Sequence, residues 1–142
     1  AYLQKHLDQN ILDTVNAQPV TIGHLHLQVG DLNQAAGFYL DKIGFERTTS
    51  IPGALFTSAG GYHHHVAMNT WHSGGAGPRA ATLGLAEVSI LVPEREDLDM
   101  LIARLGAWEH SDNGTSVAMQ DPWGTPVTVS LPGVSTEELM QR

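Results

Sequence analysis

The sequence predicts the same succession of a strand, a helix and further strands twice, and this repeat constrains the fold more than any other feature. Residues 21–29, TIGHLHLQV, alternate between apolar and more polar side chains as a strand does. The next segment has apolar side chains at helical spacing, with Asp31 placed to cap the helix start and Gly44 to end it. Shorter strands are predicted over residues 46–70. The same order of strand, helix and strands returns over residues 85–93, 94–106 and 115–131, which makes it an internal repeat.

The segments outside the two repeats define the domain boundaries. Residues 2–15 place Leu3, Leu7, Ile11 and Val15 at four-residue steps, which predicts an amphipathic helix. We therefore assign residues 1–19 to an N-terminal helix and linker. Residues 20–142 form the main domain, with modules at about 20–72 and 84–132 joined by the glycine-rich segment 72–82.

The register between the two repeats identifies candidate metal ligands. An offset of 63 residues lays His24 on Glu87, and it places Val29 on Val92, where each strand gives way to its helix. The same offset carries His65 to Thr128. Three of the four positions, His24, His65 and Glu87, hold side chains that bind metals.

Strand alternation predicts which side chains share a face. Glu87 and Ser89 lie opposite the apolar Ala86 and Val88, and Thr128 lies opposite its apolar neighbours in the last strand. The polar faces of four strands could then line one cup, with the apolar faces packed under two helices.

Three consecutive histidines in the segment GYHHHVAMNTW leave the choice of ligand open. The alternation puts His63 and His65 on the cup face, while His64 shares the apolar face of Val66 and Met68. His65 is our first choice and His63 our second.

Composition excludes several classes of function. The 142 residues carry 15 acidic and 7 basic side chains, so the net charge is −8 and there is no basic footprint for nucleic acid or an anionic membrane. No apolar run approaches the ~20 residues of a membrane span, and no signal peptide is visible. The absence of cysteine excludes thiolate metal sites and fits a reducing compartment, so we expect a cytoplasmic protein.

Two stretches of this sequence resemble a known family. HLHLQVGDLNQAAGFYLDKIGF is similar to the opening module of the vicinal oxygen chelate superfamily, and DPWGTPVTV resembles its closing turn and strand. That superfamily includes glyoxalase I, extradiol dioxygenases and the bleomycin and fosfomycin resistance proteins. Within residues 20–132, the segments GHLHLQVGDL and SAGGYHHHVAMNTW look most like the C-terminal half of a two-domain catechol-2,3-dioxygenase.

The resemblance implies an α+β fold in which paired βαβββ modules form a cup-shaped mixed sheet around a divalent metal. The ligands would come from the first and last strands of each module, which assigns them to His24, His65 and Glu87 here. Glyoxalase I enzymes typically fill all four places, and extradiol enzymes typically carry their carboxylate in the last strand. This sequence has Thr128 there, which departs from both patterns.

Two histidines and one carboxylate with open positions form the ligand set of non-haem Fe(II) oxygenases. We therefore predict an extradiol ring-cleaving dioxygenase that binds a catechol-like small molecule and Fe(II), although Ni, Zn or Mn could occupy the same ligands. The alternatives are a glyoxalase-type lyase and a binding domain without catalysis. The resemblance also implies a homodimer, or the second domain of a longer chain.

Other polar residues near these ligands are candidates for catalysis and substrate binding. His26 shares a face with His24, so His26 or His63 could move a proton during the reaction. A polar residue that simply lines the cup is an equally good interpretation of His26. Tyr62, Asn69 and Trp71 flank the three histidines and could contact substrate, although residues of these types more often serve packing and turns.

Overall fold

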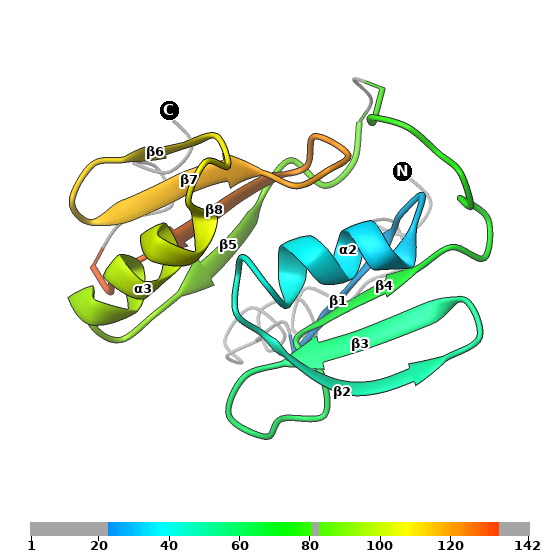
Figure 1. Cartoon of the computed structure of the whole chain (residues 1–142), viewed down its shortest axis with the longest axis horizontal. Helices are drawn as coiled ribbons and strands as arrows, with labels where there is room; N and C mark the ends of the chain where they lie inside the picture. The colour runs from blue at the N-terminus through cyan, green and yellow to red at the C-terminus, as the bar shows by residue number, and fades with distance from the viewer. Residues whose placement is uncertain (1–22, 81–82, 134–142) are drawn as a thin grey trace, which may run out of the picture.

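The computed structural model describes residues 23–80 and 83–133, and this part of the chain contains two modules of the same order (Figure 1). The first consists of β1 (Leu25–Gln28), α2 (Leu32–Tyr39), β2 (Glu46–Ile51), β3 (Ala54–Ser58) and β4 (Val66–Asn69). The second consists of β5 (Val88–Leu91), α3 (Arg95–Leu105), β6 (His110–Asp112), β7 (Ser116–Gln120) and β8 (Pro126–Ser130). The predicted α+β fold of paired βαβββ modules is confirmed. The predicted N-terminal helix lies outside the described residues.

Each module forms a mixed four-stranded sheet. The strand orders are β1-β4-β3-β2 and β5-β8-β7-β6. The first and last strands of each module pair in parallel, and the other pairs are antiparallel. A parallel pair needs a crossover, and α2 and α3 lie in these crossovers. In these strand orders, β1 and β5 are edge strands of their sheets. The two pockets described below lie beside these strands, where the modules meet.

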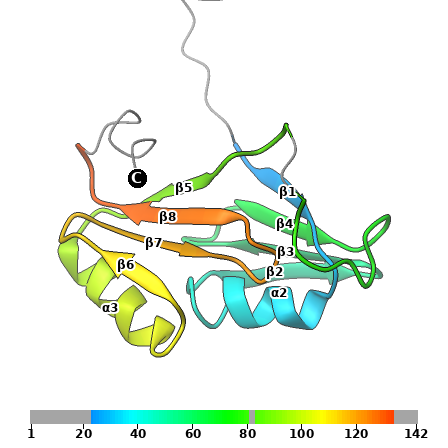
Figure 2. The same ribbon diagram turned by 90° about the horizontal axis from the view of Figure 1, so that it is seen from above.

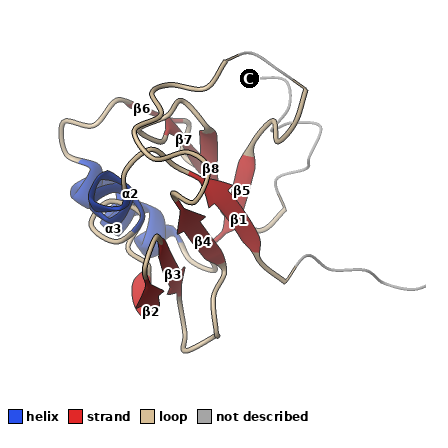
Figure 3. Ribbon diagram, turned by 90° about the vertical axis from the view of Figure 1, so that its right-hand side faces the viewer, coloured by secondary structure: helices blue, strands red, loops and turns tan. Residues whose placement is uncertain are grey.

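Both helices cover the same side of the two sheets (Figures 2 and 3). Helix α2 is capped at its start by Asp31, whose carboxylate accepts a hydrogen bond from the backbone amide of Gln34 at 2.8 Å. The helix ends at Tyr39, earlier than Gly44, and the backbone amides of Lys42 and Ile43 bond to the carbonyl of Phe38 in the turn that follows.

The core is one continuous cluster that joins the two modules. Its members are the helix-facing side chains of both sheets and the inward faces of both helices. The first module contributes Leu27, Val29, Phe38, Tyr39 and Met68, and the second contributes Leu98, Leu101, Leu105, Val117, Val127 and Val129. Because β1 alternates, His26 and Gln28 point away from this core, as predicted.

The repeat register changes within the second module. Leu25 pairs with Val66 in the first module, and Val88, 63 residues after Leu25, pairs with Val127 in the second. Val127 is 61 residues after Val66, so two fewer residues separate the first and last strands of the second module. The prediction that Thr128 is equivalent to His65 is therefore wrong, because the ladder aligns Thr128 with Ala67 instead.

Candidate metal centre and the adjoining pockets

The histidines come together where β1 and β4 begin side by side. The backbone amide of Leu25 donates to the carbonyl of His65 at 2.9 Å, which aligns the starts of the two parallel strands. The residues just before each start are His24 on one side and the triple histidine on the other. Parallel pairing thus brings His24 to the triple histidine, about forty positions away in the sequence.

Three of these imidazoles form a candidate metal centre. The ligand atoms of His24, His63 and His64 all lie within 4.8 Å of one another. Their ring centroids are 4.2 Å apart for His24 and His64, and 4.5 Å apart for His63 and His64. Imidazole nitrogens bind a divalent ion such as zinc at about 2.1 Å, so small side-chain rotations bring the three nitrogens to one ion. We refer to these three residues as the histidine cluster.

The protonation state of His64 suits this role. Partial desolvation lowers its pKa below the ordinary value, and the neighbouring imidazoles of His24, His63 and His26 act in the same direction. A lowered pKa favours the neutral imidazole, which is the form that binds metals.

His26 is hydrogen-bonded to the histidine cluster. Its Nε2 lies 3.2 Å from Nε2 of His64, so one ring donates the proton and the other accepts it. His26 and Phe56 are in edge-to-face contact, with ring centroids 5.9 Å apart. This contact places an apolar wall beside the imidazole pair.

His65 lies outside the histidine cluster. Its Nδ1 accepts a hydrogen bond from the backbone amide of Ala59 at 3.2 Å, and its ring stacks on Tyr62 with centroids 4.7 Å apart. This hydrogen bond engages Nδ1, and Nε2 is the ring nitrogen that remains for another partner. The alternation predicted His63 and His65 together, but β4 begins only at Val66 and the three histidines belong to the preceding loop.

Glu87 faces the same pocket as His24 and His65, so the three predicted ligands line one cavity of about 830 Å³ between the modules. Glu87 Oε1 is buried and has no hydrogen-bond partner in the described structure. A buried carboxylate oxygen without a partner is costly, and a bound cation would remove that cost. The donor set of imidazoles and one carboxylate oxygen fits a divalent metal. The assignment of His65 and Glu87 as ligands stays a prediction.

Apolar side chains form much of the remaining wall of that pocket. They come from the segment after α2, from β5 and from α3, and they include Ile43, Phe45, Ile90 and Leu101. The pocket is therefore suited to an aromatic ring beside the imidazoles.

The candidate substrate-binding residues separate into two places. Tyr62 lies against His63 with ring centroids 4.2 Å apart, and it is 40% exposed. Asn69 and Trp71 lie at the other end of β4, where Trp71 Nε1 donates to the carbonyl of Pro52 at 3.3 Å. The structure brings Tyr62 to the histidine cluster and leaves Asn69 and Trp71 at the turn between β2 and β3.

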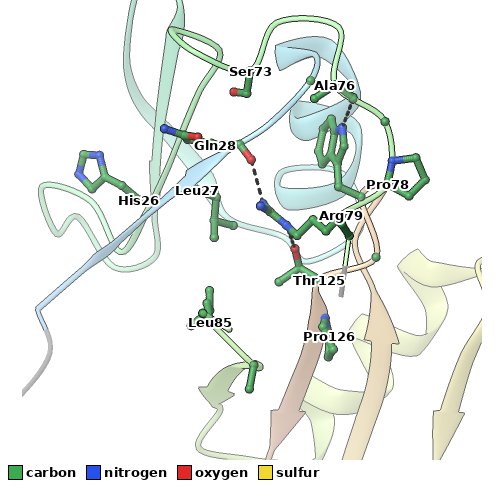
Figure 4. Close-up of a pocket in the computed structure, with 17 residues that line it drawn as sticks. His26, Leu27, Gln28, Ser73, Ala76, Pro78, Arg79, Leu85, Thr125 and Pro126 are labelled. Atoms are coloured by element: carbon green, nitrogen blue, oxygen red, sulfur yellow. Dashed lines mark hydrogen bonds between the residues drawn. The ribbon is translucent and has the colours of Figure 1, made fainter. Parts of the chain in front are cut away.

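A second pocket, of about 770 Å³, lies between β1, the inter-module segment and the turn before β8 (Figure 4). Arg79 enters it and is held by two hydrogen bonds, from Nε to Thr125 Oγ1 at 2.7 Å and from Nη2 to the carbonyl of Gln28 at 2.8 Å. Sequence reasoning missed this residue because the segment 72–82 predicts only a glycine-rich linker. Its one basic residue, in a chain with few, was the available signal.

The sequence profile of the glyoxalase/bleomycin resistance protein/dioxygenase superfamily matches residues 21–128. The chain belongs to this superfamily. Its similarity to catechol-2,3-dioxygenase from Bacillus subtilis (strain 168) is 38% identity over 106 residues, or 71% of this chain. The chain spans only 37% of the length of that superfamily relative.

Solved structures of the superfamily share the fold. A domain from Frankia sp. EAN1pec has a TM-score of 0.63 and 20% identity, and the match covers 80% of this chain and 98% of the Frankia domain. Lactoylglutathione lyase from Agrobacterium tumefaciens has a TM-score of 0.55 and 21% identity over 80% of this chain and 95% of its own. The fosfomycin resistance protein FosX from Mesorhizobium loti has a TM-score of 0.59 and 16% identity, and the match covers 86% of this chain and 99% of FosX.

The described helices are short, and none has the length and apolar content that would let it cross a membrane.

Proposed function

We propose that this protein is a metal-dependent oxidoreductase that cleaves the ring of a catechol-like substrate in the extradiol manner. The observation that carries the proposal is the histidine cluster, whose member His24 lines one pocket together with the unpartnered carboxylate oxygen of Glu87. The similarity to catechol-2,3-dioxygenase supports the same reaction class.

The metal-binding residues would be His24, His64 and Glu87. Two neutral imidazoles and one carboxylate are the set that non-haem Fe(II) oxygenases use. Bound Fe(II) supplies the redox chemistry and the open positions that a catechol and dioxygen need in order to react. Ni, Zn or Mn would fit the same side chains, so the preference for iron rests on the proposed reaction.

His26 would move the proton of the substrate hydroxyl. It is hydrogen-bonded to His64 and is exposed on the face away from the core, so its ring is open to a substrate held beside the histidine cluster. His63, which is also exposed, is the second candidate for this role.

Oxygen uptake with catechols tests the proposal. Protein loaded with Fe(II) under nitrogen should consume dioxygen when a catechol is added, and mass spectrometry should find both atoms of ¹⁸O₂ in a ring-opened product. His24→Ala should abolish uptake. The exposed His72, which lies outside the cluster, provides the matched control His72→Ala, and this variant should keep the wild-type rate.

The His26→Gln variant tests the proton-transfer role separately. We expect kcat to fall by about 10²-fold with metal content unchanged, because the lost group acts on the proton and leaves the metal in place. A wild-type rate in this variant would remove His26 from the reaction.

Two rival functions would show as different outcomes of the same preparation. A glyoxalase-type lyase would isomerise the hemithioacetal of glutathione and a 2-oxoaldehyde with Ni or Zn bound, and it would consume no oxygen. A non-catalytic binding domain would show neither activity. Either outcome would overturn the dioxygenase proposal.

A further inference from the structure

Arg79 is a cation fixed in position by both modules. Its Nη2 is bonded to the carbonyl of Gln28 in β1, and its Nε is bonded to Thr125 Oγ1 in the turn before β8. Its own backbone amide donates to the carbonyl of Trp123 at 2.8 Å. The two side-chain bonds hold the guanidinium in the pocket of Figure 4 without using all of its donors, and the third bond fixes the backbone at Arg79.

Within the described part of the chain, the guanidinium pairs with no anionic group. Among residues 23–80 and 83–133, no carboxylate oxygen lies within 4.0 Å of its nitrogens. The buried carboxylate of Asp121 is occupied elsewhere, because it accepts from Tyr39 Oη and from the backbone amides of Trp123 and Thr125. The free N–H groups of Nη1 and the second of Nη2 can therefore take both oxygens of one carboxylate.

The rest of the pocket suits an aromatic body attached to that carboxylate. Leu27, Leu85, Trp123 and Pro126 supply apolar wall, and His26 lines the same pocket. His26 and Gln28 are two positions apart on one face of β1, roughly 7 Å along the strand. One side of the pocket thus reaches the imidazole bonded to the histidine cluster, and the other side reaches the fixed guanidinium.

We propose that this pocket binds the carboxylate of an aromatic substrate, with Arg79 as the residue that recognises the anion. A guanidinium that is already ordered loses little further side-chain freedom when it binds, which favours a planar, bidentate partner. The proposal that this substrate is a carboxylated catechol rests on the proposed function, whereas the anion site itself does not.

Equilibrium binding to metal-free protein tests the site apart from any reaction. The probes are benzoate and benzamide, which share a shape and differ in charge, and the signal is intrinsic tryptophan fluorescence, to which Trp123 in the pocket wall contributes, backed by calorimetry. Wild-type protein should bind benzoate at least about tenfold more tightly than benzamide, because only the anion pairs with Arg79. The preference should weaken as salt is added.

Three variants assign the effect. Arg79→Gln should abolish the preference for benzoate, and Arg79→Lys should retain part of it, since the charge remains but the fork is lost. Arg47 on β2 is exposed and lies outside the pocket, so Arg47→Gln should behave as wild type.

Equal binding of benzoate and benzamide by the wild-type protein would overturn the proposal, and this comparison needs no variant to fold. An unchanged preference in folded Arg79→Gln would also overturn it. Failure of oxygen uptake with intact benzoate selectivity would reject the dioxygenase and leave the anion site standing. Iron-loaded protein that cleaves catechol, but not 3,4-dihydroxybenzoate, would reject the carboxylated substrate alone.

Discussion

The hydrogen bonds around Asp121 show how single residues hold the turn that carries the anion pocket. Asp121 is 3% exposed, and its two oxygens accept from Tyr39 Oη and from the backbone amides of Trp123 and Thr125. Burial raises the pKa of Tyr39 well above its usual value, the Asp121 carboxylate raises it further, and Arg79 acts in the opposite direction. The Tyr39 hydroxyl therefore remains a donor throughout the ordinary pH range.

Removing the Asp121 carboxylate should destabilise the protein markedly. Asp121→Ala leaves three buried donors without their acceptor, and we expect the free energy of unfolding to fall by at least about 2 kcal/mol in urea denaturation. Asp41→Ala, at an exposed aspartate after α2 whose side chain bonds to no other described residue, should change it by less than about 0.5 kcal/mol. A loss of the same size in both variants would contradict the importance of this network.

At the residue scale, sequence reasoning found the region of the site better than its members. His24 was predicted from the repeat register, and it belongs to the histidine cluster. The choice among His63, His64 and His65 relied on strand alternation, which does not hold in the loop before β4. Arg79 was missed because its neighbours across space, Gln28 and Thr125, are 51 and 46 positions away in the sequence.

At the scale of elements, two glycines that look alike in the sequence have opposite roles. A Cβ at Gly30, after β1, would collide with the carbonyl oxygen of Ala76 and crowd Trp123 Nε1, which donates to that oxygen. A Cβ at Gly37, inside α2, would meet no atom within 4 Å.

These surroundings predict opposite effects of the same substitution. Gly37→Ala should raise the free energy of unfolding by up to about 1 kcal/mol, because alanine is the better helix former. Gly30→Ala should lower it by about 1–3 kcal/mol through overpacking, and should also weaken benzoate binding in the adjoining pocket. Chemical denaturation of the two variants beside wild type is the measurement, and a stabilised Gly30→Ala would refute the contact with Ala76.

The elements themselves were largely predictable, because periodicity is a local property. The alternation of β1 and the helical spacing of α3 follow from neighbouring residues. The offset between β4 and β8 depends on loop length and pairing across the sheet, and a single offset of 63 for both strands of a module therefore failed in the last strand.

At the scale of the whole molecule, hydrogen bonds between the C-terminal regions of the two helices join the modules. Lys42 Nζ donates to the carbonyls of Arg104 and Leu105, and Arg104 donates in return to the carbonyls of Lys42 and Ile43. The shared apolar core and the bond from Tyr39 to Asp121 cross the same boundary. The two modules should therefore behave as one cooperative unit.

Cooperativity predicts coincident unfolding of the two modules. Urea transitions followed by the fluorescence of Trp71 alone and of Trp123 alone, in variants that lack Trp108 and keep only one of these two tryptophans, should share a midpoint with the far-UV circular dichroism transition. Two separate transitions, one for each module, would show that the contacts between modules are weak.

The central claim is that the histidine cluster, with Glu87, holds a metal, and metal content tests it most directly. After anaerobic loading with Fe, Ni or Zn and desalting, the wild-type protein, His72→Ala and His65→Ala should retain about one ion per chain. His24→Ala and His64→Ala should lose it, and Glu87→Gln should bind it more weakly while Glu109→Gln, at an exposed position, should not. A wild-type protein that takes up none of the three metals would contradict the account, and loss in His65→Ala with retention in His64→Ala would move the ligand to His65.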